Sequence, residues 1–276
     1  MQNINKKNLS MQKNKQPIGV FDSGVGGLSV LIELQKLLPN ENFIFLADQL
    51  YVPYGEKSKK ELVELGFRVT DYLIKNHNIK MMVIACNTST CNSIAELRKK
   101  YCLPIVGTVP AIKMAAEKTK TKTVAIISTP STSQSQTLKN LIKDNCKGIK
   151  VINIGCKNLE DTVEHGDLNS AEVKKLLQKY LKDIKNSNAD HLVLGCTHYP
   201  FLRYTIGKIL GSHVKLIDGG LAISKQTSNL LANHFLENNQ KKQGQIQYYS
   251  TSNSIKFSKV ASKLLKHQIK AEKVAI

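Results

Sequence analysis

Short apolar runs alternate with longer amphipathic stretches along most of this chain, and this alternation limits the folds it can adopt. The apolar runs have the length of strands, at residues 18–21, 43–46, 81–85, 105–106, 124–127, 151–154, 191–194 and 214–217. Helical periodicity marks the stretches between them, at residues 28–38, 57–77, 93–101, 111–118, 135–143, 170–186 and 201–210. Strands that alternate with helices pair in parallel. The sequence therefore predicts an α/β fold of mostly parallel sheets flanked by helices.

Two of the expected strands end in a cysteine that is followed at once by small polar residues. The stretches are "VIACNTST" at 83–90 and "VLGCTHYP" at 193–200, which place Cys86 and Cys196 in matching positions. Ligands of parallel sheets bind outside the carboxyl ends of the strands. The same unit in each half of the chain predicts two similar lobes with an active site in the cleft between them.

The domain boundaries follow from this duplication. Residues 1–16 are polar and basic and are expected to form a mobile arm. Residues 17–109 together with 220–276 are expected to form the first lobe, and residues 110–219 the second. "VGTVPAI" and "IDGGLAI" are the expected crossovers, and a helix over about 220–238 would return to the first lobe.

Charge and cysteine usage exclude several classes of protein. The formal net charge is +19, yet only three of the 40 basic residues are arginines, and the lysines are scattered. Arginine is the preferred side chain for bidentate phosphate and base recognition, so nucleic-acid binding is expected to be non-specific at most. No apolar run approaches the roughly 18 residues that cross a bilayer, and no secretory signal begins the chain. We expect a cytoplasmic protein with reduced thiols and no membrane partner.

Other patterns allow more than one interpretation. The glycine-rich turn "GVFDSGVGGLSV" fits anion binding at a helix start, an incomplete dinucleotide fingerprint, or a plain tight turn. His198 close to Cys196 fits a nucleophilic pair or a metal site, but further ligands at zinc-like spacing are missing, so no metal is expected. We expect structural roles for the remaining cysteines, Cys91, Cys102, Cys146 and Cys156.

Two cysteines on facing lobes suit one kind of chemistry in particular. A nucleophilic cysteine needs one thiol and one base, and a redox pair needs adjacent sulfurs. Racemisation of a carbon acid instead needs one group that removes a proton from one face and a second that delivers a proton to the other. Cys86 and Cys196 would supply these two groups, with His198 orienting or charging Cys196.

Four motifs in order, "FDSGVGGLSV", "VPYGEKS", "IACNTST" and "LGCTHYP", resemble the glutamate racemase family, which is independent of pyridoxal phosphate. The resemblance covers residues 17 to about 238 and is weak beyond them. It implies that Cys86 takes the α-proton of D-glutamate and Cys196 that of L-glutamate. It implies that Asp22 assists Cys86, and that His198 and Glu164 lie beside Cys196.

The resemblance also implies which residues hold the substrate carboxylates and amino group, namely Ser23, Pro53, Tyr54, Gly55, Asn87, Thr88, Thr132 and Thr197. Asp22 is suited to pair with the substrate ammonium or to relay protons. No cofactor is expected. The implied role is supply of D-glutamate for peptidoglycan, with aspartate or a hydantoin as the alternative substrate. A homodimer and activation by a peptidoglycan precursor are left open.

Overall fold

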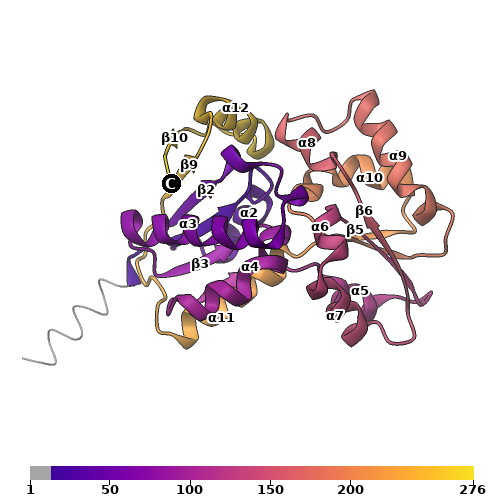
Figure 1. Cartoon of the computed structure of the whole chain (residues 1–276), viewed down its shortest axis with the longest axis horizontal. Coiled ribbons are helices and arrows are strands. Elements are labelled where there is room, and N and C mark those ends of the chain that lie inside the picture. The colour runs from indigo at the N-terminus through magenta and orange to yellow at the C-terminus, as the bar shows by residue number, and fades with distance from the viewer. Residues whose placement is uncertain (1–13) are drawn as a thin grey trace, which may run out of the picture.

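The computed structural model describes residues 14–276, which form two parallel sheets flanked by helices (Figure 1). The first sheet has six strands in the order β10 (Ala271–Lys273), β9 (Ile246–Ser250), β2 (Phe43–Ala47), β1 (Ile18–Asp22), β3 (Met81–Ile84) and β4 (Ile105–Gly107). The second has four, in the order β6 (Lys150–Gly155), β5 (Thr123–Ser128), β7 (His191–Leu194) and β8 (Lys215–Ile217). Every strand pair is parallel, so the predicted fold class is confirmed.

The helices cover both faces of each sheet, which accounts for the apolar strands. Around the first sheet lie α2 (Leu28–Leu37), α3 (Lys59–His77), α4 (Asn87–Lys100), α11 (Gly220–Asn233) and α12 (Ser254–Leu265). Around the second lie α5 (Ile112–Lys118), α6 (Pro130–Gln134), α7 (Gln136–Asn145), α8 (Leu159–Glu164), α9 (Ala171–Lys185) and α10 (Arg203–Leu210). Short 3₁₀ turns are η1 (Gln49–Tyr51), η2 (Tyr54–Glu56) and η3 (Tyr199–Leu202).

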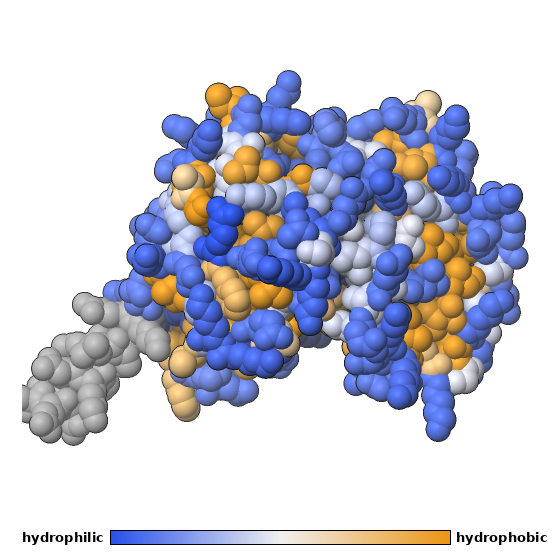
Figure 2. All heavy atoms as spheres, in the orientation of Figure 1, coloured by the Kyte–Doolittle hydropathy of each residue, from blue (hydrophilic) through white to orange (hydrophobic). Residues whose placement is uncertain are grey.

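The core follows the alternation of side chains along the strands. Val20 and Phe21 are adjacent in β1, and they belong to apolar clusters on opposite faces of the first sheet. The Val20 cluster continues through Val25 in the glycine-rich turn to Val163 in α8 and Tyr199 in η3. The two lobes therefore share an apolar contact beside the cleft, while the surface seen in Figure 2 is mostly hydrophilic.

Several elements differ from the sequence-based expectation. β9, β10, α12 and the short helices α6 and α8 were not predicted, and the helix expected over 220–238 ends at Asn233. Helix α4 was expected from residue 93 but begins at Asn87, because its first turn is polar and is recognised only by its cap at Cys86. The arm expected at residues 1–16 lies, up to residue 13, outside the described residues. Within residues 14–276 no helix is long and apolar enough to cross a membrane.

Candidate active site

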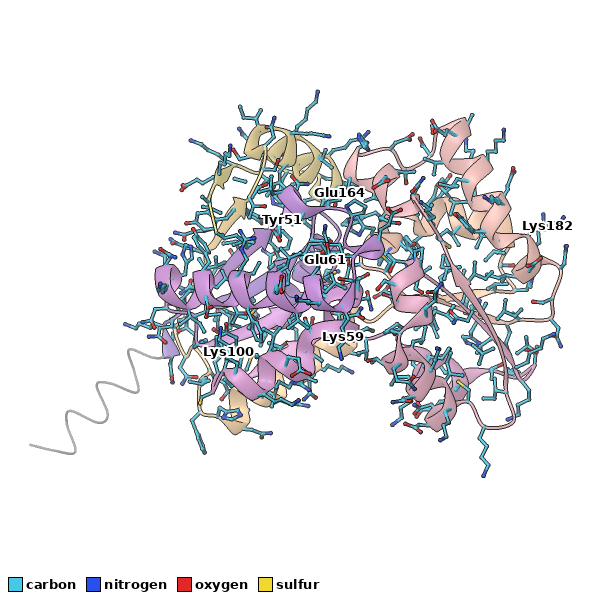
Figure 3. The ribbon with its side chains drawn as sticks, in the orientation of Figure 1. Tyr51, Lys59, Glu61, Lys100, Glu164 and Lys182 are labelled. Carbon is cyan, nitrogen blue, oxygen red and sulfur yellow. The ribbon has the colours of Figure 1, made fainter. Side chains whose placement is uncertain are left out.

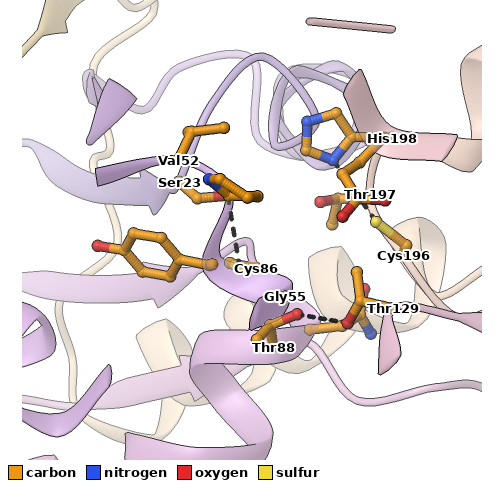
Figure 4. A pocket seen from close by; sticks show the side chains of 13 residues that line it. Ser23, Val52, Gly55, Cys86, Thr88, Thr129, Cys196, Thr197 and His198 are labelled. Carbon is orange, nitrogen blue, oxygen red and sulfur yellow. Dashed lines mark hydrogen bonds between the residues drawn. The ribbon is translucent and has the colours of Figure 1, made fainter. Parts of the chain in front are cut away.

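The carboxyl ends of β3 and β7 bring Cys86 and Cys196 to one small pocket between the two sheets. Both side chains are buried, and they lie on different sides of this pocket (Figure 4). The residues that line it come from strand ends and the helix starts that follow them, from η2 and the loop before it, and from α8. They are Ser23, Val52, Pro53, Tyr54, Gly55, Cys86, Asn87, Thr88, Thr129, Glu160, Cys196, Thr197 and His198. Two thiols from separate sheets thus face a shared space.

Cys86 caps the first turn of α4. Its sulfur accepts a hydrogen bond from the Ser89 N–H at 3.4 Å, and its thiol lies 3.9 Å from Ser23 Oγ as a donor. Burial raises the pKa of Cys86 well above its usual value, and the charge of Asp22 adds to the rise. The helix start at Cys86 would favour a thiolate, but burial outweighs it, so the surroundings favour the neutral thiol.

Asp22 joins the two lobes beneath the pocket. Its Oδ1 accepts a hydrogen bond from Ser23 Oγ at 2.9 Å, and its Oδ2 accepts one from Thr197 Oγ1 at 2.9 Å. Complete burial raises the pKa of Asp22 to about 6, against the opposing charge of His198. Cys86, Ser23 and Asp22 therefore form a hydrogen-bonded row along which a proton can move.

Cys196 has a different partner set. Its sulfur lies 3.5 Å from His198 Nδ1, and His198 Nε2 lies 2.6 Å from Glu164 Oε1. Burial raises the pKa of Cys196, and His198 opposes that rise. Burial alone would lower the pKa of His198, but Cys196 and Glu164 outweigh it and hold that pKa well above its usual value. The geometry suits an imidazolium between a carboxylate and a sulfur.

Glu164 is held in place by groups of the first lobe, beside which it lies in Figure 3. The Val25 N–H donates to Oε1 at 2.7 Å and the Gln49 side-chain amide donates to Oε2 at 2.7 Å. Burial would raise the pKa of Glu164, yet these donors and above all His198 bring it below its usual value. Glu164 is therefore a carboxylate that completes a line of contacts across the cleft.

The glycine-rich turn is explained by this line of contacts. A Cβ on Gly24 would lie 1.8 Å from Glu164 Oε1, and one on Gly26 would lie 2.4 Å from His198 Nδ1. Any side chain at these positions would displace the acid and the imidazole. The turn therefore packs directly against Glu164 and His198.

Hydroxyl groups form the opposite wall. Thr88 Oγ1 lies 2.8 Å from Thr129 Oγ1 and 3.2 Å from Thr132 Oγ1, and Asn87 Nδ2 donates to the Thr108 carbonyl at 3.1 Å. Thr132 does not line the pocket but holds the two threonines that do. The loop side of the pocket is Pro53, Tyr54 and Gly55, with the Tyr54 hydroxyl directed away to Asp48 at 2.6 Å.

Asp22, Thr132 and Glu164 lie just behind the pocket rather than on its wall, and the other predicted site residues line it. The site residues named from the sequence did not include Val52 or Glu160, and Thr129 was expected only as one of the polar residues at strand ends. Thr129 follows β5, where the rule of strand ends predicts functional residues. Glu160 lies in the unpredicted helix α8, and no signal in the sequence marks it. All six cysteines are free, and within the described residues no group of His, Cys, Asp or Glu is arranged for a metal ion.

The profile of the family described as Asp/Glu/Hydantoin racemase matches residues 29–227. The chain belongs to the Asp/Glu/Hydantoin racemase family. A relative in that family, the glutamate racemase of Herpetosiphon aurantiacus, is 39% identical over 245 residues, which is 89% of this chain and 96% of that protein. The predicted resemblance to glutamate racemases is therefore confirmed.

Solved structures of this racemase family agree with the sequence comparison. Glutamate racemase isoform RacE1 from Bacillus anthracis superposes with a TM-score of 0.86 at 29% identity, over 95% of this chain and 98% of that chain. Escherichia coli glutamate racemase, in complex with L-glutamate and the activator UDP-MurNAc-ala, superposes with a TM-score of 0.84 at 29% identity, over 94% and 98%. The racemase fold thus extends over nearly the whole described chain.

Proposed function

We propose that this protein interconverts L- and D-glutamate by a two-base mechanism that needs no cofactor, and that it supplies D-glutamate for peptidoglycan synthesis. One observation carries the mechanism: two buried thiols from separate sheets face one pocket. A planar carbanion-like state between the two sulfurs can receive a proton on either face. The reaction then follows from which sulfur removes the proton and which returns it.

The two sulfurs are assigned different roles by their neighbours. Cys86 takes the α-proton of D-glutamate, and Ser23 and Asp22 form the route by which Cys86 loses its own proton beforehand. Cys196 takes the α-proton of L-glutamate, and the imidazolium of His198, held by Glu164, stabilises its thiolate. This asymmetry suits mirror-image substrates in one chiral pocket.

The remaining polar groups suit a substrate with two carboxylates and one ammonium. We assign the substrate ammonium to Asp22. The Asp22 carboxylate accepts hydrogen bonds from Ser23 and Thr197, which line the pocket in front of it. The carboxylates are assigned to the hydroxyl and amide wall of Asn87 and Thr88, with Thr132 behind it as support, and to the loop of Pro53, Tyr54 and Gly55. Fixed donors of this kind stabilise the negative charge that develops as the α-proton leaves.

Substrate entry requires the lobes to separate. The pocket retains a cavity volume of only about 20 Å³, which is the space of about one water molecule. Glutamate is several times larger, so this conformation is closed. We propose that the first lobe, 17–109 with 220–276, moves against the second, 110–219, and that closure excludes water from the reacting carbon.

Proton NMR of L-glutamate in deuterated water, with metal-free and cofactor-free protein, tests the mechanism. Deuterium should enter the α-carbon as racemisation proceeds. Replacement of either cysteine, Cys86→Ala or Cys196→Ala, should lower racemisation by at least about 10³-fold, because one face loses its acid/base group. Cys102→Ala, at an exposed free cysteine, is the control. Racemisation at the wild-type rate in either single variant would refute the two-base assignment.

The alternative substrate is aspartate or a hydantoin, since the family description names all three substrates. A panel of enantiomerically pure substrates separates these activities. Faster racemisation of aspartate than of glutamate would replace the first proposal. Tight binding to DNA at physiological salt without racemisation of glutamate would replace the enzyme proposal altogether.

We also propose an activator, an oligomeric state and a cellular compartment for this protein. The Escherichia coli relative was solved with an activator, so we propose that UDP-MurNAc-ala raises the racemisation rate of this protein, measured with and without it. We propose a homodimer, to be tested by analytical ultracentrifugation. The six free cysteines fit the reducing cytoplasm as the compartment.

A further inference from the structure

Glu160, in α8, has a buried carboxyl oxygen that the mechanism does not use. The residue is only 6% exposed and lines the pocket. Its Oε2 is buried and makes no hydrogen bond within residues 14–276. A buried carboxylate oxygen without a donor is energetically costly, so such an atom needs a proton or a ligand.

Glu160 lies near Gly55, at one side of the pocket. A Cβ on Gly55 would lie 3.2 Å from Glu160 Oε1. Gly55 lines both the pocket of the two cysteines and a neighbouring surface hollow. Glu160 therefore lies at the Gly55 side of the cysteine pocket, next to the surface hollow.

The surroundings of Glu160 favour its neutral form. Burial is the main cause of its raised pKa. A hydrogen bond from its own backbone N–H and the charge of His198 oppose the rise, and the charges of Asp161 in α8 and Glu56 in η2 increase it. Its other titratable neighbours are the thiols at the ends of β6 and β7 and a phenol in η3, namely Cys156, Cys196 and Tyr199. An anionic substrate placed beside it would raise the pKa further.

We propose that Glu160 is a specificity-determining residue of this site: in its protonated form it donates a hydrogen bond from Oε2 to the side-chain carboxylate of the bound amino acid. This inference rests on the proposed glutamate racemase function. A protonated carboxyl group recognises a carboxylate, whereas the ionised form repels it, so the same residue selects dicarboxylic amino acids and makes their binding depend on pH.

The test compares the KM for D-glutamate from pH 6 to pH 9 in the wild-type enzyme, Glu160→Gln and Glu160→Leu. Gln keeps a donor and cannot ionise, whereas Leu removes the donor. Above the pKa of Glu160 in the free enzyme, binding to the wild-type enzyme must take up a proton, so the ratio of its KM to that of Glu160→Gln should rise by up to about 10-fold per pH unit. At pH 6, Glu160→Leu should raise KM by about 10-fold and change kcat less.

The measured KM values support or overturn the proposed role of Glu160. A KM ratio between wild type and Glu160→Gln that does not change with pH overturns it, as does a wild-type KM in Glu160→Leu. Glu172→Gln, at an exposed acid in α9 of the same lobe, should keep the wild-type pH profile. Absence of glutamate racemisation in the wild-type enzyme overturns the proposed function as well, whereas racemisation with a constant KM ratio overturns only the role of Glu160.

Discussion

Asp22 shows at the scale of one residue how a functional group reduces the stability of its own fold. Its side chain is fully buried among hydroxyl groups and touches no cation directly. Burial raises its pKa from an ordinary 3.8 to about 6. The folded state therefore binds the proton more tightly than the unfolded state, and stability falls as pH rises through this window.

Asp22→Asn should accordingly stabilise the protein while it lowers activity. At pH 8 the wild-type carboxylate is charged and destabilises the fold by about 3 kcal/mol relative to its neutral form, a cost that Asn avoids. Urea unfolding should show a gain of this order at pH 8 that shrinks towards pH 4. Asp183→Asn, at an exposed acid in α9, serves as the control. An equal change at both pH values would contradict the argument.

Individual residues also show the limit of sequence reasoning. The strand-end rule placed Cys86 and Cys196 at the pocket, because strand ends are local features. The partners of Glu164 are 34 and 139 positions away along the chain, at His198 and Val25. Nothing local in the sequence could fix these distances, and only the resemblance pointed to Glu164.

At the scale of elements, the caps at helix starts decide where the site residues lie. Helix α3 begins directly after the loop that contains Pro53, Tyr54 and Gly55. Its N-cap residue, Ser58, forms a capping box with Glu61. The Ser58 hydroxyl accepts from the Glu61 N–H at 3.3 Å, and the Glu61 carboxylate accepts from the Ser58 N–H at 2.8 Å. The box fixes the start of α3 and with it the end of the loop that contains Gly55.

Ser58→Ala should remove this cap and destabilise the protein by about 1 kcal/mol. Urea denaturation at neutral pH measures the change. The control is Ser212→Ala, since Ser212 is exposed in the turn before β8. Equal unfolding midpoints for Ser58→Ala and Ser212→Ala would show that the box contributes nothing.

The errors in predicting helices and strands arise where the sequence has no clear apolar periodicity. Long helices with a clear apolar face, such as α3 and α9, were predicted within about two residues. The start of α4 was missed because "NTSTCNS" has no apolar periodicity, and its first turn is held by Cys86 and by tertiary contacts instead. Strand β9 pairs with β2 near one edge of the first sheet. Most of its residues are only partly buried, so its sequence has a weak apolar pattern.

At the scale of the whole molecule, the closed pocket supports the proposed movement between lobes. Cys91 in α4 and Ser135 at the cap of α7 belong to different lobes and meet near the surface hollow. The Ser135 side chain lies beside the Cys91 thiol, and its hydroxyl donates to the Thr132 carbonyl at 2.8 Å. Thr137 donates to the Cys91 carbonyl at 2.8 Å. A covalent bond at this contact would hold the lobes together.

Ser135→Cys should form a disulfide with the native Cys91 under mild oxidation and abolish most racemisation, because substrate cannot enter a locked cleft. Dithiothreitol should restore activity. The wild-type enzyme and Ser133→Cys, whose position faces Pro130 within the second lobe, should resist the same oxidant. A fully active oxidised variant with a confirmed disulfide would show that entry needs no separation at this contact.

The sequence by itself determined the strand–helix alternation, the parallel sheets and the placement of Cys86 and Cys196 at strand ends, because these depend on periodicity and on short-range order. The family resemblance added glutamate. Only the tertiary structure decided that Gly24 and Gly26 make room for Glu164 and His198, and that Glu160 lines the pocket and, within the described residues, has a buried oxygen without a hydrogen-bond partner. These features depend on burial and on distances across the cleft, which arise when the two lobes pack together.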